Sequence, residues 1–265
     1  MCFLITLLQL IKVLKVILPV KEVFMKTIGA FLDIDGTLYR NSLMIEHFKK
    51  LLKYEVIDPA LWHNHVKQTY YDWQKRRGNY DAYLLELAQV YIDCLKGLNK
   101  NHLEFIDNQV IDLKGDKVYK YTRARIAWHK SQRHKVFFIS GSPEYLVKKM
   151  AKKYDITDYR GTQYILDKDN NFTGEIIQMW DSQSKHQAIM EFIRKYNIDL
   201  SKSYSYGDTT GDYSMLKMIG HPIAINPTKE LLEKIKDDEE LFEKITIIVE
   251  RKDVIYKLDG NVEIL

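Results

Sequence analysis

The sequence contains very little cysteine. Cys2 and Cys94 are its only two thiols in 265 residues. They form neither the paired framework of a small secreted protein nor the closely spaced Cys and His ligands of a zinc site. We therefore expect a cytoplasmic protein in which neither cysteine is a nucleophile.

The chain also lacks a marked excess of either charge. Its 40 Lys and Arg residues oppose 36 Asp and Glu residues, which leaves a scattered net charge of +4. This balance does not indicate a nucleic-acid partner. A long uninterrupted hydrophobic run is missing as well, because Lys12 and Lys15 interrupt the apolar first twenty residues and the stretch before Lys12 is too short to span a bilayer.

Residues 1–24 form an apolar N-terminal extension. Its lysines follow or interrupt the apolar run, whereas a secretory signal carries its positive charges ahead of that run. Two interpretations stay open: an amphipathic surface helix that contacts membrane or protein, or a translated leader ahead of a true start at Met25, which we favour. Membrane contact is expected only if residues 1–20 are translated.

Short apolar runs that end in polar loops predict the fold. Such runs occupy residues 27–32, 136–139 and 203–206, and helical periodicity covers residues 144–154 and 184–196. This alternation predicts an α/β fold with a doubly wound, Rossmann-like parallel sheet. Its functional site should lie at the carboxyl edge of the strands.

The segment between the first two expected strands has no strand-like alternation and suits paired helices. We expect residues 42–120 to form an α-helical cap inserted into a catalytic core of residues 25–41 and 121–265. Within that core, residues 164–176 predict a hairpin. The alternating apolar residues after about position 240 predict strands of unassigned function.

Two carboxylates at one strand end suggest the chemistry. They belong to Asp33-Ile34-Asp35-Gly36-Thr37. A carboxylate that attacks a phosphate ester forms an acyl phosphate, which is reactive enough to be hydrolysed in a second step. The other carboxyl group, initially protonated, can give its proton to the leaving alkoxide and then deprotonate the attacking water.

Further polar residues follow the other expected strands. Asp208 and Asp212 lie four positions apart across a strand-to-helix turn, so that one can bind Mg²⁺ and the other brace it. Ser140 offers a hydroxyl group ahead of a helix N-terminus that favours a phosphate oxygen, and Lys185 adds positive charge. Each feature alone is weak evidence, since Asp-x-Asp can cap a helix and a lone lysine is usually exposed.

The order of these motifs resembles that of the haloacid dehalogenase superfamily of phosphohydrolases, over residues 26 to about 230. The resemblance implies that Asp33 is the nucleophile and that Asp35 is the acid and base. It implies these further roles: phosphate binding by Thr37, Ser140, Gly141 and Lys185, and metal binding by Asp33, Asp35 through its backbone carbonyl, Asp208 and Asp212.

The helical insert resembles the cap of the phosphoserine phosphatase-like branch, subfamily IB. The stretches Gly161-Thr162, Phe172-Thr173-Gly174-Glu175 and residues 220–227 are also similar to that branch. Two departures weigh against phosphoserine as the substrate. Ser42 stands near the position of a glutamate in true phosphoserine phosphatases, and Gly211 replaces the asparagine before the last aspartate.

The sequence thus predicts a Mg²⁺-dependent phosphomonoester hydrolase that acts on a small phosphorylated metabolite through an aspartyl-phosphate. Three alternatives stay open: phosphoserine phosphatase proper, a lysophosphatidate or glycerol-phosphate-type phosphatase at the membrane surface, and a catalytically idle phosphate-binding protein. The presence of both Asp33 and Asp208 weighs against the idle protein. The sequence leaves the physiological substrate and the oligomeric state open.

Overall fold

The computed structural model describes residues 26–264 except residue 79. The apolar extension of residues 1–24 and the possible start at Met25 therefore lie outside the described residues. Among the helices that are described, none combines the length and the apolar character needed to cross a membrane.

The described strands form one eight-stranded sheet in the order β4-β3-β2-β1-β5-β6-β7-β8. They are β1 Gly29–Leu32, β2 Lys135–Pro143, β3 Asp158–Leu166, β4 Phe172–Ile177, β5 Tyr204–Gly207, β6 His221–Ile225, β7 Thr246–Arg251 and β8 Val254–Leu258. The inner strands are parallel, and β4 and β8 pair antiparallel at the edges. The predicted doubly wound parallel sheet is confirmed.

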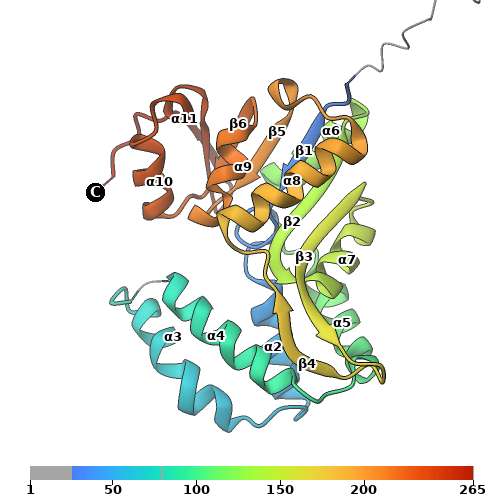
Figure 1. Ribbon diagram of the computed structural model, residues 1–265. Coiled ribbons are helices and arrows are strands. Elements are labelled where there is room, and N and C mark those ends of the chain that lie inside the picture. Colours follow the sequence, from blue (N-terminus) through green and yellow to red (C-terminus); the bar gives the residue numbers. More distant parts are fainter. Residues whose placement is uncertain (1–25, 79, 265) are drawn as a thin grey trace, which may run out of the picture.

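Helices separate most of these strands (Figure 1). They are α2 Leu43–Lys53, the π-helix η1 Trp62–Val66, α3 Lys67–Gln74, α4 Tyr80–Leu95, α5 Lys100–Lys114, α6 Lys120–Ser131, α7 Glu144–Lys153, α8 Ser182–Tyr196, the 3-10 turns η2 Leu200–Lys202 and η3 Thr210–Asp212, α9 Tyr213–Met218, α10 Lys229–Lys236 and α11 Glu239–Lys244. Helix α8 begins ahead of the expected residue 184, because the Asp181 side chain caps it by accepting from the Ser184 N–H.

Two apolar clusters cover the two faces of the sheet. Successive side chains of a strand point to opposite faces, so Ala30 and Leu32 of β1 pack in one cluster with α6 and α7. Phe31 packs in the other cluster with α8 and α9, where its ring stacks on Phe137 with centroids 5.0 Å apart. The central strands are therefore buried on both sides, as parallel strands usually are.

Helices α2 to α5 form a helical insert, residues 43–114, with an apolar cluster of its own that includes Phe48, Leu87 and Tyr91. Helices α2, α3 and α4 lie in the lower half of Figure 1, with α2 beside β4. Helix α5 connects insert and core, since its Ile106 packs in the insert cluster and its Val110 in the sheet cluster. The division of the chain at residues 42 and 120 stays a prediction.

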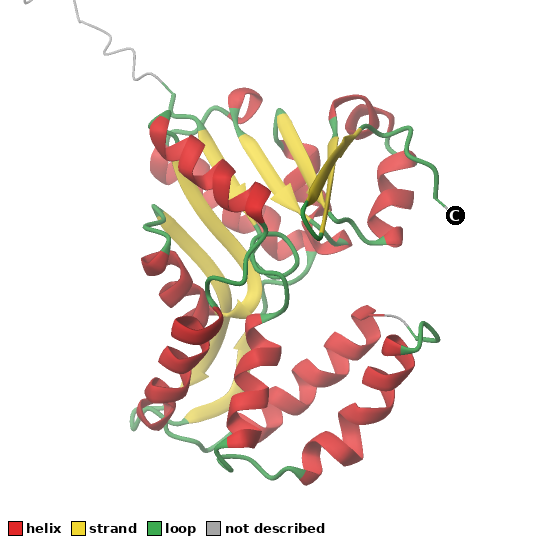
Figure 2. Cartoon of the chain, turned by 180° about the vertical axis from the view of Figure 1, so that it is seen from behind, coloured by secondary structure: helices red, strands yellow, loops and turns green. Residues whose placement is uncertain are grey.

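The predicted hairpin is formed by β3 and β4, which carry the sheet down beside the insert (Figure 2). Phe172 of β4 joins the apolar cluster of the insert. The strands expected after position 240 are β7 and β8, with β8 at the sheet edge.

A buried polar network links the insert to α7. The His47 ring lies 2.6 Å from the Tyr91 hydroxyl and 2.9 Å from Asp107 Oδ1, and Lys100 Nζ lies 2.5 Å from Asp107 Oδ2. Tyr91 also bonds the Tyr145 hydroxyl of α7 at 2.6 Å. Because buried polar groups are costly without partners, this network favours one placement of the insert on the core.

A second buried network lies beneath β5. The Tyr206 hydroxyl accepts from Arg125 Nε at 3.1 Å and contacts His129 Nε2 at 2.8 Å, while His129 Nδ1 lies 2.9 Å from His134 Nδ1. Tyr206 can then donate to His129, and His129 to His134, which satisfies a neutral imidazole. Burial, reinforced by the charge of Arg125 and by His134, lowers the pKa of His129 to about 3.

This low pKa makes stability dependent on pH. In the unfolded chain the His129 pKa is near 6.5, so the unfolded state binds more protons between about pH 6.5 and pH 3, and acid destabilises the fold in that window. As pH falls through this window, the free energy of unfolding of the wild type should decrease. We expect His129→Gln to make this decrease smaller by up to about 1.4 kcal/mol per pH unit. Urea denaturation at stepwise pH values measures this. Parallel profiles for wild type and variant would contradict a neutral, buried His129.

Candidate active site

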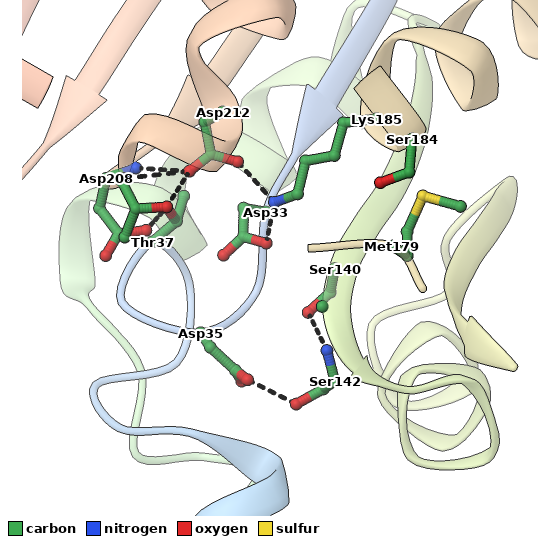
Figure 3. Close-up of polar contacts among 12 residues, drawn as sticks. Asp33, Asp35, Thr37, Ser140, Ser142, Met179, Ser184, Lys185, Asp208 and Asp212 are labelled. Carbon is green, nitrogen blue, oxygen red and sulfur yellow. Dashed lines mark hydrogen bonds and ion pairs between the residues drawn. The ribbon is translucent and has the colours of Figure 1, made fainter. Parts of the chain in front are cut away.

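The acidic loops after β1 and β5 meet because these two strands are neighbours in the sheet. The chain winds in opposite directions from this pair, which makes the carboxyl ends of β1 and β5 the point where ligands bind in such sheets. Asp33 follows β1 and Asp208 follows β5, and Figure 3 shows both carboxylates on the same side of the strand ends.

Lys185 of α8 joins the two acidic loops. Its Nζ lies 2.7 Å from Asp33 Oδ1 and 2.6 Å from Asp212 Oδ1, and all three side chains are buried. Burial lowers the pKa of Lys185, but the two carboxylates outweigh this and raise it above its ordinary value. The lysine is therefore charged. Its burial could not be predicted from the sequence, because a lone lysine ahead of a helix is usually exposed.

Asp212 holds the backbone of the β5 loop. Its Oδ2 accepts from the N–H groups of Asp208 at 3.0 Å and Thr209 at 3.2 Å, while its Oδ1 is paired with Lys185. Both oxygens are thus engaged. Asp208 is positioned in addition by Thr37, whose hydroxyl donates to Asp208 Oδ1 over 2.9 Å.

The acidic cluster fits a hard divalent cation. Oxygens of Asp33, Asp208 and Asp212 lie within 4.8 Å of one another, and Lys185 offsets only one of the three negative charges. Burial raises the pKa of Asp208, and the charges of Asp212 and Asp33 raise it further. Mg²⁺ prefers carboxylate oxygens, and its charge would relieve this repulsion.

Asp35 lies apart from that cluster and faces the insert. Its carboxylate accepts from Ser142 Oγ at 2.5 Å, the Leu43 N–H at 3.0 Å and Ser42 Oγ at 3.1 Å. Burial raises the pKa of Asp35, and these hydrogen bonds partly oppose the rise. The raised pKa favours the protonated form that a general acid requires.

Sequence reasoning assigned no role to Ser142, although a signal was present. Ser142 follows Ser140 by two positions in a segment that continues β2, and side chains two apart in a strand share a face. Ser42, identified from sequence only as a departure from phosphoserine phosphatases, both caps α2 and donates to Asp35.

A cavity of about 430 Å³ opens at this edge of the sheet. Asp33, Asp35, Gly141 and Lys185 line it. Within the part of the chain that the structure describes, the other expected site residues lie behind this wall: Thr37, Ser140, Asp208 and Asp212. The Ser140 hydroxyl accepts from the Ser142 N–H at 3.3 Å.

Trp180, between β4 and α8, is a cavity residue that the sequence did not reveal. A Cβ atom at Gly141 would lie 2.8 Å from Trp180 Cβ, and one at Gly211 would lie 2.3 Å from the Trp180 carbonyl oxygen. The Trp180 backbone therefore occupies the volume that a side chain at position 211 would need. This explains why glycine stands here in place of the asparagine of phosphoserine phosphatases.

The family model of the haloacid dehalogenase-like hydrolases matches residues 30–217, most of the chain. The chain belongs to this family. The matched segment begins in β1 and ends in α9, so it contains the whole acidic cluster and Lys185. The expected family is confirmed.

Relatives and solved structures of the family agree with this placement. The chain is 25% identical over 205 residues to the "inhibition of morphological differentiation protein" of Streptomyces azureus, covering 77% of this chain and 73% of that one. It is 24% identical over 218 residues to a histidinol-phosphatase of Neisseria meningitidis, covering 80% and 96%. A phosphoserine phosphatase solved as a phospho-aspartyl intermediate analogue superposes with a TM-score of 0.57, at 20% identity, covering 86% and 95%. The predicted phosphatase is confirmed.

The glycine between Asp35 and Thr37 provides a test of the site packing. Gly36 has φ +83°, and a Cβ atom there would lie 1.9 Å from Asp208 Oδ2. We expect Gly36→Ala to reduce stability by more than the about 1–2 kcal/mol that a left-handed backbone costs a residue with a Cβ, and to lower activity by displacing Asp208. Chemical denaturation and phosphate release measure the two effects.

Gly97→Ala is the matched control, because Gly97 has φ +81° but no atom of the described residues lies within 4 Å of where its Cβ would stand. It should show the backbone cost alone and keep full activity. Equal effects of the two variants would show that the carboxylate of Asp208 does not restrict position 36.

Proposed function

We propose that this phosphatase hydrolyses phosphate monoesters by attack of the Asp33 carboxylate on phosphorus. The observation that carries the proposal is the pairing of buried Asp33 with Lys185 on the wall of a cavity that Asp35 also lines. One carboxylate is thus oriented by a cation, and a second, held by hydroxyl and N–H donors, faces the same space. This combination suits two-step transfer through an acyl phosphate.

In the first step, Asp33 Oδ2 forms the bond to phosphorus, since Oδ1 is held by Lys185. The bond between phosphorus and the ester oxygen breaks, and protonated Asp35 gives its proton to the leaving alkoxide. Lys185 keeps the attacking carboxylate in place and, with the Gly141 backbone, binds the phosphate group. Thr37 and Ser140, which the family resemblance also assigns to phosphate binding, are buried next to this lining.

In the second step, Asp35, now a carboxylate, takes a proton from a water molecule. That water attacks phosphorus, the bond to Asp33 breaks, and inorganic phosphate leaves with Asp33 restored as a carboxylate. Ser142 and Ser42 donate hydrogen bonds to Asp35, which stabilises its ionised form between the steps. The same residue can therefore act first as acid and then as base.

Mg²⁺ is the proposed cofactor, held by the carboxylates of Asp33 and Asp208 and by the backbone carbonyl of Asp35. Bound there, it would neutralise charge on the phosphoryl oxygens. Asp212 is less available than Asp33 and Asp208 to bind the ion, because both of its carboxylate oxygens already accept hydrogen bonds. Its part is to brace Asp208 and to orient Lys185.

We further propose a small phosphorylated metabolite as the substrate. One relative is named a histidinol-phosphatase and another a phosphoserine phosphatase, and the cavity has the size of a small-molecule site. Phosphoserine itself is less well supported, since Ser42 is engaged with Asp35 at the position expected to hold the substrate amine.

Asp33→Asn tests the nucleophile. The amide cannot form the acyl phosphate, so kcat should fall by roughly a thousandfold or more, whereas the fold should persist because one buried charge is removed. Phosphate release from a panel of monoesters measures this, with circular dichroism as the folding check. Asp112→Asn on the exposed side of α5 is the matched control and should retain full activity. Turnover of Asp33→Asn at the wild-type rate would refute the assignment.

Removal of divalent metal tests the acidic cluster. Chelation should abolish activity and Mg²⁺ should restore it. At 100 times its Kd, Mg²⁺ should also stabilise the native protein by about 2.7 kcal/mol, a shift of several degrees in Tm for a chain of this size. Asp208→Asn should remove this shift without lowering the metal-free Tm, because it relieves repulsion between buried carboxylates. A Tm shift that survives in Asp208→Asn would place the metal elsewhere.

A further inference from the structure

The two sides of the cavity differ in chemistry. The core contributes the charged and polar groups, among them Asp33, Asp35 and Lys185. Ser42, directly ahead of the insert, is hydrogen-bonded to Asp35. The described residues of the insert that line the cavity are all apolar: Met44 of α2 and Leu84, Leu85 and Ala88 of α4. Ala88 follows Leu84 by four positions and Leu85 by three, the spacings at which helical side chains are neighbours.

This apolar wall is placed to receive the organic part of the substrate. A phosphate group bound by Lys185 and attacked by Asp33 leaves its ester oxygen near Asp35, and Asp35 bonds the N-terminus of α2. The alcohol that leaves must therefore extend toward the insert. Trp180 borders the same space from the core.

A carboxylate on that alcohol would find no cationic partner among the described residues of the insert that line the cavity. The described cavity lining contains no arginine, and its only lysine besides Lys185 is Lys234 of α10, an element of the core. The Lys234 ammonium lies 4.1 Å from the centroid of the Tyr213 ring. A carboxylate against Met44 and Leu85 would be desolvated without a counter-charge, which is costly.

Leu85 shows that the wall is not simply part of the insert core. It lines the cavity but is 59% exposed, whereas Leu87, two positions on, is fully buried in the insert cluster. An apolar residue that is open to a cavity can gain burial from a ligand.

We propose that the insert forms an apolar subsite that selects monoesters of uncharged alkyl or aryl alcohols over esters that carry a carboxylate. This inference rests on the proposed function and assigns its substrate class. Met44, Leu84, Leu85 and Ala88 are the specificity-determining residues, and Leu85 is the one that can be changed with the least effect on folding.

The experiment measures kcat/KM for straight-chain alkyl phosphates from methyl to hexyl, with O-phosphoserine as the charged comparison. For the native protein, kcat/KM should rise about fourfold for each methylene that the wall covers, and phosphoserine should be poorer than propyl phosphate. Leu85→Ala should lower kcat/KM for hexyl phosphate by roughly tenfold and leave methyl phosphate unchanged. Leu113→Ala is the matched control. Leu113 of α5 is 56% exposed, which is close to the 59% of Leu85, but it does not line the cavity.

A second measurement separates this inference from the proposed function. Alkyl phosphonates of the same lengths, which cannot be hydrolysed, are titrated into the Mg²⁺-loaded protein by calorimetry. Affinity that rises with chain length in the absence of any turnover would overturn the phosphatase mechanism and retain the subsite. Turnover without dependence on chain length, or with phosphoserine preferred, would overturn the subsite and retain the mechanism.

Discussion

The buried ammonium group of Lys185 is the interaction on which the site depends. It stands between Asp33 and Asp212, and without it these two buried carboxyl groups would have no counter-charge between them. Through Asp212 it also fixes the loop that carries Asp208. A single side chain from α8 therefore sets the positions of carboxylates from two strands. The resulting excess of negative charge, which is unfavourable by itself, prepares the site for a divalent cation.

Much of the fold followed from local patterns. Apolar runs that ended in polar loops marked β1, β2 and β5, because parallel strands buried on both faces need continuous apolar residues. The acidic motifs could be placed together in advance, since the carboxyl ends of parallel strands share one edge of the sheet. Residues Asp33, Lys185, Asp208 and Asp212 do converge there. Their roles in catalysis remain predictions.

Other features depend on contacts between distant segments, which no local pattern records. The donors that surround Asp35 come from both the start of α2 and the end of β2. Trp180 enters the cavity from an irregular connection, where neither helical nor strand periodicity applies. The apolar face of α4 was also ambiguous, because residues that line a cavity and residues that fill a core look alike in sequence. In the structure Leu85 lines the cavity and Leu87 is buried in the insert cluster. The sequence alone does not distinguish these two leucines.

The distance along the chain between the parts of the site has a consequence for biosynthesis. Thr37 and Asp208 are hydrogen-bonded partners separated by 171 positions, and β5 pairs directly with β1 at the centre of the sheet. During translation, β1 and β2 are synthesised before β5, so the nascent chain carries the Asp33 motif before its partner loop has been made. A chain that terminates before β5 lacks Asp208, and one that terminates before α8 lacks Lys185 as well, so neither fragment holds the complete acidic cluster.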